Sequence, residues 1–231
     1  MLLDPYWERG GLAASLPASL HTAEFAAAIQ AHRDALRALT PDPAAVQWQY
    51  RVPELGEGGS CSLFGQLAAA PYDLAATLGG ATPANQQLLA GVTALVAYYR
   101  AHSASHWFGV YQARTLADGS RALVKLAYFG AESRAEFPLT PEFAQISNNS
   151  AVGLSGRGRV INDVARYVAD GGEYYTCDPK VQAEACLPLF GSAGQVVGII
   201  DSEAFAQGFF SGPELALLLA VATELSDGRL G

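Results

Sequence analysis

Cysteine is scarce in this sequence of 231 residues, which contains only Cys61, Cys177 and Cys186. Three cysteines do not make the disulfide framework of a small secreted protein. The N-terminus also lacks the basic segment followed by an apolar segment that marks a secretory signal. No apolar run approaches the length of a membrane span, and the stretch from Leu215 to Val221 is far too short. We therefore expect a cytoplasmic protein with no membrane partner.

Positive charge is scarce as well, because 14 Lys and Arg residues stand against 22 Asp and Glu residues, which gives a net charge of −8. A nucleic-acid-binding surface normally needs a basic stripe, and docking on anionic lipid needs basic clusters. We therefore expect no nucleic-acid partner. Charged residues make up only 16% of the chain and hydrophobic residues 50%, so the chain can bury a sizeable core.

Three helices are predicted from apolar spacing and from their start signals. Residues 22–39 are rich in alanine and begin after Thr22, a plausible cap, and a second helix follows the Thr82-Pro83 pair. A capping box from Ser211 to Glu214 opens the last helix. Residues 1–80 are expected to be an N-terminal extension with one or more helices.

The segments between these helices read as strands and loops. An Asp118-Gly119 turn and a glycine-rich turn at residues 191–194 each separate two strand-like runs, which predicts antiparallel hairpins. A short helix is expected near Glu142 to Asn148, and the stretch from Gly153 to Arg159 reads as a turn. This order predicts an α+β fold, with helices packed on one face of an antiparallel sheet and a ligand pocket on the other.

Acidic residues interrupt two of the strand-like runs near the C-terminal end. Side chains alternate along a strand, so four of them share one face of the last run. These are Val197, Ile199, Asp201 and Glu203. A third acid, Glu184, lies in the preceding run, and Cys177 comes seven residues before it. Buried acids destabilise a protein unless they have cationic or hydrogen-bonding partners. The sequence therefore predicts a pocket that gathers three acids and a thiol.

These motifs resemble those of a GAF domain and, within that superfamily, of the free methionine-(R)-sulfoxide reductases. The resemblance covers roughly residues 85–227 and identifies residues 81–231 as the GAF domain. It rests on a Trp-x-Gly-apolar-Tyr strand, a Cys-Asp pair seven residues before a Glu, and an acid pair at a strand end. In this sequence they are Trp107 to Tyr111, Cys177-Asp178 with Glu184, and Asp201 with Glu203 in place of a second aspartate.

The resemblance implies a site for a zwitterionic amino acid, in which acids hold the ammonium group and a tryptophan shields the sulfoxide methyl. The ligand-binding residues would be Trp107, Tyr111, Glu184, Asp201 and Glu203. Cys177 would attack the sulfur atom, and a second thiol or a thioredoxin-type reductant would reduce the resulting sulfenic acid. No cofactor is implied. Asp178 is a better candidate for a turn residue than for an acid catalyst.

The sequence departs from the reductases at two cysteines that the family carries upstream of the attacking one. Those neighbourhoods read Ser133-Arg134 and Ser147-Asn148-Asn149-Ser150. Cys186 falls on the same strand face as Glu184, so it is a candidate resolving thiol, and its alternative role is that of a small buried apolar residue.

Three interpretations stay open on the sequence alone. The motif of Cys177, Glu184 and Asp201 favours a reductase, whereas the missing cysteines favour a non-catalytic sensor or binding module. The third is an interaction protein that forms a homodimer through its terminal helices, using the apolar stripe from Leu215 to Leu225. No metal site is expected, because the few histidines lack the spacing of zinc ligands.

Overall fold

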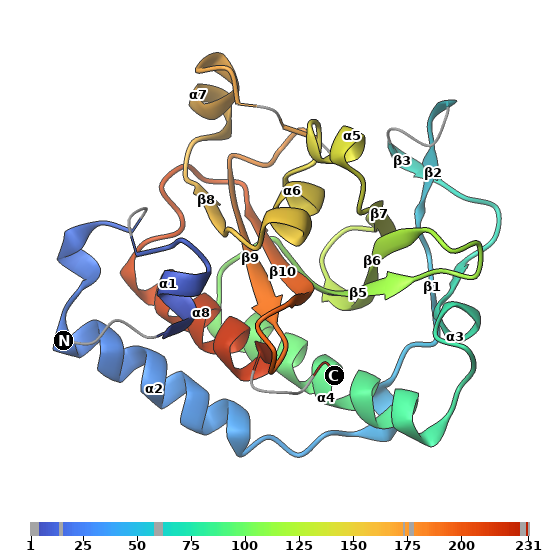
Figure 1. Cartoon of the computed structure of the whole chain (residues 1–231), viewed down its shortest axis with the longest axis horizontal. Coiled ribbons are helices and arrows are strands. Elements are labelled where there is room, and N and C mark those ends of the chain that lie inside the picture. The colour runs from blue at the N-terminus through green and yellow to red at the C-terminus, as the bar shows by residue number, and fades with distance from the viewer. Residues whose placement is uncertain are drawn as a thin grey trace.

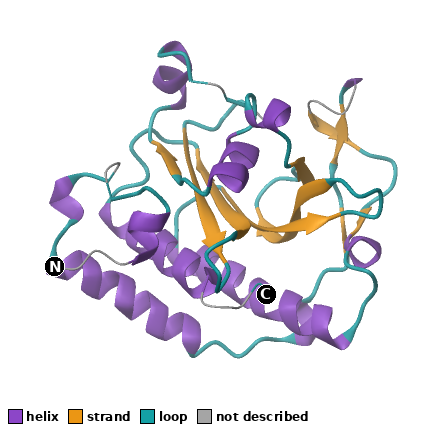
Figure 2. Cartoon of the chain, in the orientation of Figure 1, coloured by secondary structure: helices purple, strands orange, loops and turns teal. Residues whose placement is uncertain are grey.

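The computed structural model describes residues 5–13, 16–57, 62–172, 174–175, 178–226 and 230, and a six-stranded antiparallel sheet forms its centre (Figure 1; Figure 2). The strands are β5 (Trp107–Thr115), β6 (Arg121–Phe129), β7 (Glu136–Pro138), β8 (Arg159–Ile161), β9 (Ala183–Phe190) and β10 (Val196–Ala204). Their order across the sheet is β7-β6-β5-β10-β9-β8, so the β5–β6 and β9–β10 hairpins meet at its centre. The predicted α+β class with an antiparallel sheet is confirmed.

Both central hairpins turn where the sequence predicted. Gly119 lies between β5 and β6 with φ of +84°, and Gly194 lies between β9 and β10 with the same φ. Glycine adopts this left-handed conformation without the steric cost that a Cβ imposes. The local turn signals therefore set the pairing of the four longest strands.

Three helices lie on one side of the sheet, where Figure 1 shows them together beneath the strands. They are α2 (Ala23–Arg37), α4 (Pro83–His102) and α8 (Gly212–Ser226). The Thr22 and Thr82 hydroxyls accept hydrogen bonds from the third residue of their helices, at 3.2 Å each, which confirms both predicted caps. None of the described helices is long and apolar enough to cross a membrane.

The start of α8 differs from the prediction. The Ser211 N–H donates to the Phe209 carbonyl at 2.8 Å, so it does not donate to the Glu214 carboxylate as a capping box requires. The Glu214 carboxylate instead accepts hydrogen bonds from the Ser103 hydroxyl at 2.7 Å and from the Ala104 N–H at 3.2 Å. The predicted capping box is wrong because the loop after α4 binds the carboxylate.

The chain's own α2 covers α8. Every residue from Leu215 to Leu225 is buried within the chain. Arg33 and Arg37 of α2 form ion pairs with Glu224 of α8, whose side chain is 3% exposed, at 2.7 Å and 2.8 Å. The expectation that this stripe is open to a second copy of the chain is therefore wrong, because α2 already occupies it.

Residues before position 81 pack on the same core as the sheet. Their elements are α1 (Pro5–Arg9), the 3-10 turns Ala18–Leu20 and Pro43–Ala45, β1 (Gln49–Tyr50), β2 (Pro53–Leu55), β3 (Ser62–Leu67), β4 (Tyr72–Asp73) and α3 (Leu74–Thr77). The Tyr6 hydroxyl donates to the Pro188 carbonyl of β9, and the Tyr50 hydroxyl donates to the Lys125 carbonyl of β6, both at 2.8 Å. The helices of this part are α1, α2 and α3, and the division of the chain into an N-terminal extension and a domain near residue 80 stays a prediction.

On the other face of the sheet, α6 (Asn148–Ser155) lies against β9 and β10, and α5 (Pro141–Ala144) packs against α6. The short helix α7 (Val164–Ala169) follows β8. A Cβ on Gly153 would lie 2.8 Å from Leu139 Cδ2, so the glycine lets α6 approach its neighbours closely. Because Gly153 belongs to α6 and the helix ends at Gly156 with φ of +66°, the turn predicted to begin at Gly153 is wrong.

Candidate functional site

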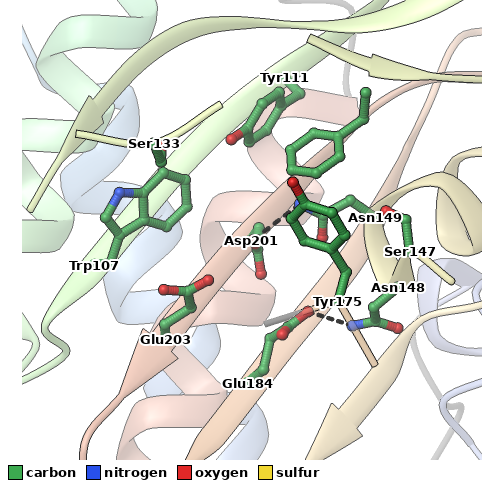
Figure 3. Close-up of a pocket in the computed structure, with 11 residues that line it drawn as sticks. Trp107, Tyr111, Ser133, Ser147, Asn148, Asn149, Tyr175, Glu184, Asp201 and Glu203 are labelled. Atoms are coloured by element: carbon green, nitrogen blue, oxygen red, sulfur yellow. Dashed lines mark hydrogen bonds between the residues drawn. The ribbon is translucent and has the colours of Figure 1, made fainter. Parts of the chain in front are cut away.

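A narrow cavity lies on the sheet face opposite α2, α4 and α8, and we call it the inner cavity (Figure 3). The space between its lining atoms and the open solvent at its mouth amounts to about 350 Å³, of which about 20 Å³ is open to the centre of a water-sized sphere. Its lining consists of Trp107, Tyr111, Ser133, Phe137, Ser147, Asn148, Asn149, Tyr175, Glu184, Asp201 and Glu203. The five residues that the sequence assigned to ligand binding are therefore brought together around one hollow.

Three acids face this cavity from the two central C-terminal strands (Figure 3). Glu203 of β10 lies directly opposite Glu184 of β9 in the strand register, and Asp201 lies two residues along β10 on the same face. Ile199 continues this face, but Val197 packs with the helix-side core because the register shifts between Val196 and Gly198. The predicted common face holds for Ile199 and both acids of β10 and is wrong for Val197.

Burial raises the pKa values of all three acids, and neighbouring acids raise those of Asp201 and Glu203 further. Burial is the largest cause for each, and it disfavours the charged form. Burial and the charges of Glu184 and Asp178 raise the pKa of Glu203 to about 8. Burial and the charges of Glu184 and Glu203 raise the pKa of Asp201 well above its ordinary value. The pKa of Glu184 is raised by burial, against hydrogen bonds from Asn148 and Tyr174.

Two of these acids have a cation nearby, and the third has none among the described residues. Arg159 of β8 opposes the rise in the Glu184 pKa, and Lys125 of β6 opposes the rise in the Glu203 pKa. No cation in the described ranges acts on the Asp201 pKa in this way. The Asp201 Oδ1 atom is buried and has no hydrogen-bond partner in the same part of the chain. Asn149 Oδ1, also in the cavity lining, is a second buried acceptor without a partner among these residues.

Aromatic rings form the wall opposite the acids. The Trp107 indole donates its N–H to the Ala131 carbonyl at 3.0 Å, which fixes the ring over β5. A Cβ on Gly109 would lie 2.3 Å from the indole, so only glycine fits beneath it. Tyr111 and Tyr175 lie across the hollow from the acids in Figure 3. Aromatic faces attract cations, as carboxylates do, so the aromatic wall and the acids both favour a positively charged group.

No protein-family model and no curated protein matches the chain. Solved structures do match. The free methionine-R-sulfoxide reductase of Neisseria meningitidis, solved in complex with its substrate, aligns with a TM-score of 0.51 and 20% identity over 62% of this chain and 77% of that one. The type II free methionine-R-sulfoxide reductase of Thermoplasma acidophilum aligns with a TM-score of 0.50 and 21% identity over 62% and 96%. A protein of Burkholderia vietnamiensis assigned as a GAF sensor aligns with a TM-score of 0.52 and 15% identity over 88% and 91%.

This chain has the GAF-domain fold. The resemblance read from the sequence is therefore confirmed at the level of the fold. At these identities the fold is common to reductases and to a sensor. The chemistry of this GAF domain therefore depends on its own residues.

Two asparagines at the start of α6 complete the site, and the sequence analysis did not assign them to it. The Asn148 side-chain amide donates to the Glu184 carboxylate, and the Asn149 amide donates to Asp201 Oδ2 at 3.1 Å. Ser147 caps α6 by accepting a hydrogen bond from the Ser150 N–H, which fixes the turn that carries both amides. The available signal was their position, because they stand where the resemblance led us to expect a cysteine.

Of the two cysteines assigned to redox chemistry, Cys177 belongs to the chain segment beside the inner cavity. Cys177, the predicted nucleophile, lies outside the described residues, as does Cys61. The chain on either side of Cys177 borders the site, because Tyr175 lines the inner cavity and Asp178 acts on the Glu203 pKa. The Asp178 carboxylate accepts a hydrogen bond from the Lys180 N–H at 2.9 Å, which confirms its predicted role in a turn.

Cys186, the predicted resolving thiol, is fully buried and is not part of the cavity lining. It lies opposite Asp201 in the register and on the same sheet face as Glu184, as predicted. Burial and the charges of Asp201 and Glu184 raise its pKa well above the ordinary value, so the reactive thiolate is disfavoured. This environment favours its alternative role as a small apolar residue.

The described part of the chain holds no group of three or more histidine, cysteine, aspartate or glutamate side chains arranged to bind a metal ion. The three acids of the inner cavity are therefore not a metal-binding group of this kind.

Proposed function

We propose that this GAF domain is a small-molecule-binding module whose inner cavity holds the ammonium group of an amino-acid-like ligand beside Asp201. One observation carries the proposal. The Asp201 carboxylate is 2% exposed, faces the cavity, and has one oxygen without a partner among the described residues. A buried carboxylate in this condition is costly, and a ligand ammonium group would remove that cost.

The other residues of the cavity support a cationic ligand. Burial and the neighbouring acids raise the pKa values of Asp201 and Glu203, because they disfavour the charged form of each. An ammonium group would supply the missing counter-charge and form charge-assisted hydrogen bonds, each worth about 1.5–3 kcal/mol net. The Trp107 and Tyr111 rings would contact the alkyl part of the ligand and its charge.

Calorimetry with free methionine-(R)-sulfoxide and with norleucine tests this proposal. We expect the wild-type protein to bind at least one of them, and Asp201→Asn to lose roughly ten- to a hundredfold in affinity, which corresponds to one charge-assisted hydrogen bond. The matched control is Asp34→Asn, an exposed aspartate of α2, which should leave the affinity unchanged. Equal affinities for wild type and Asp201→Asn, or no binding by the wild type, would contradict the proposal.

A second candidate function is the reduction of free methionine-(R)-sulfoxide by Cys177. It is favoured by the position of this residue, between Tyr175 of the cavity lining and Asp178 beside Glu203. The thiol would take the sulfoxide oxygen, so that methionine leaves and a cysteine sulfenic acid remains. Two thiols of an external reductant would then restore Cys177, yielding a disulfide and water.

An assay of methionine formed in the presence of dithiothreitol separates the two functions. Turnover that is lost in Cys177→Ser and kept in Cys186→Ser would establish the reductase. Binding without turnover in the wild-type protein would leave the binding module and remove the reductase. The Cys186→Ser variant is a suitable control because its thiol is buried away from the cavity lining.

A further inference from the structure

Two buried oxygens of the inner cavity accept no hydrogen bond from the residues that the structure describes. They are Asp201 Oδ1 and Asn149 Oδ1, and the two residues are 2% and 6% exposed. Both residues line the same hollow. A buried acceptor without a donor is costly, so two of them in one place point to a bound group that donates at least twice.

A hydrogen bond joins these two side chains, as the dashed line between them in Figure 3 shows. The Asn149 amide N–H donates to Asp201 Oδ2 at 3.1 Å. This contact assigns the two ends of the amide, because its nitrogen faces a carboxylate oxygen and its own oxygen is left for another donor. The backbone of Asn149 is fixed as well, because Ser147 caps the first turn of α6.

The neighbouring asparagine has partners at both ends of its amide. Asn148 donates to the Glu184 carboxylate, and its oxygen accepts a hydrogen bond from the Arg159 guanidinium at 3.4 Å. Asn149 donates to Asp201 in the same way, but its oxygen accepts nothing from the described ranges. Asn148 therefore completes a network with a cation of the protein, whereas Asn149 leaves a place for a cation from outside the chain.

The free space of the inner cavity suits one small group. About 20 Å³ is open to the centre of a water-sized sphere, which is enough for about one such sphere. An unsubstituted ammonium group is about as large as a water molecule, whereas each methyl group on the nitrogen enlarges it and removes a donor. A primary ammonium group therefore matches both the pair of acceptors and the space.

We propose that Asn149 makes the inner cavity specific for a primary ammonium group. Asp201 Oδ1 accepts one N–H of the bound nitrogen and supplies the counter-charge, and Asn149 Oδ1 accepts a second N–H of the same nitrogen. Asn149 is therefore a specificity-determining residue that contacts the ligand and also orients Asp201. This inference rests on the proposed function and names its ligand class as primary amines.

Probes of equal charge that differ in their N–H donors test the inference. The parent probe is whichever of norleucine and methionine-(R)-sulfoxide binds more tightly, and it is compared with its N,N-dimethyl derivative, which keeps a single N–H. Calorimetry on the full chain should show that the derivative binds roughly tenfold more weakly or worse, because one of the two acceptors loses its donor. Equal affinities for the two probes would overturn the inference.

Variants of Asn149 separate this effect from the bulk of the methyl groups. Asn149→Leu keeps nearly the size and branching of the side chain but cannot accept a hydrogen bond. We expect it to bind the parent probe roughly tenfold more weakly and to reduce the preference over the derivative to near unity. Gln86→Leu, which removes an exposed amide of α4, should retain the preference. Asn149→Met, with a more flexible apolar side chain, takes its place if the leucine variant does not fold.

The outcomes distinguish this inference from the proposed function. A preference of the same size in wild type and Asn149→Leu would be an effect of bulk, and it would overturn the inference. If Asp201→Asn still weakens binding of the parent probe in that case, the ammonium site at Asp201 stands. If neither norleucine nor methionine-(R)-sulfoxide binds to the wild-type protein, the proposed function and the inference both fall.

Discussion

Replacing Glu203 by glutamine should make the protein more stable at alkaline pH. Glu203 lies opposite Glu184 in the strand register, and burial together with the charges of Glu184 and Asp178 raises its pKa to about 8, with Lys125 opposing the rise. Glutamine has nearly the shape of the protonated acid and does not ionise. The variant therefore keeps the neutral side chain that the folded protein prefers at this position.

The size of the effect follows from the pKa difference between the unfolded and folded states. Unfolding returns the pKa from about 8 to its ordinary value of 4.5, so the folded state holds a proton that the unfolded state has lost between these values. Stability is complete below the unfolded pKa and falls as pH rises through the folded pKa. At about 1.36 kcal/mol per pKa unit, the limit is about 5 kcal/mol. We expect about half of this limiting free-energy difference, because Asp201 and Glu184 share the remaining protons of the cluster with Glu203.

Urea unfolding of wild type and Glu203→Gln near pH 4 and near pH 9 measures this difference. The two proteins should agree within about 0.5 kcal/mol at the lower pH, and the variant should be more stable by about 2–3 kcal/mol at the higher pH. Glu142→Gln, which changes an exposed glutamate, is the control and should follow the wild type. Parallel curves for wild type and Glu203→Gln, or a variant that is less stable near pH 9, would refute the reasoning.

Three further predictions concern other parts of the molecule. Cys186, left as the sole thiol by serine at the other two cysteines, should resist a thiol reagent in the native protein and react once urea unfolds it, because it is fully buried. Glu224→Gln should lower the free energy of unfolding by about 3 kcal/mol, since it leaves the α2 arginines without their buried partner, whereas Asp34→Asn should change it little. Norleucine affinity should rise by calorimetry between about pH 6 and pH 8, because Glu203 ionises there; a falling affinity would contradict the site.

The parts of the fold that the sequence predicted correctly depend on local signals. Thr22 and Thr82 cap helices through residues three positions away, and the Asp118-Gly119 turn joins strands that follow one another. Such signals act over a few residues and do not depend on the rest of the chain. The capping box predicted at Ser211 is wrong because a contact that is distant in the sequence overrides the local signal. The loop after α4, more than a hundred residues away, binds the Glu214 carboxylate.

The candidate site likewise has a part that local sequence signals predict and a part that they do not. The acids of β9 and β10 could be placed on one face, because strand alternation and a short hairpin fix their relation. The contacts of Asn148 and Asn149 join residues 36 and 52 positions apart, and no local pattern predicts that α6 rests against these strands. Phe64 of β3, which lines a neighbouring hollow together with Trp107 and Glu203, comes from a segment to which the sequence assigned no role at the site.

The asparagines change what the site is suited to do. A cysteine at either position could exchange electrons but would donate only a weak hydrogen bond, whereas each amide donates firmly to one carboxylate. At Asp201 this contact uses Oδ2 and leaves Oδ1 open, so the amide orients the acid without satisfying it. Redox catalysis by Cys177 would have to take all its reducing electrons from an external thiol if the buried Cys186 stays inert. Recognition of a cation, in contrast, uses the acids, amides and rings as they already stand, which is why binding is the stronger of the two proposals.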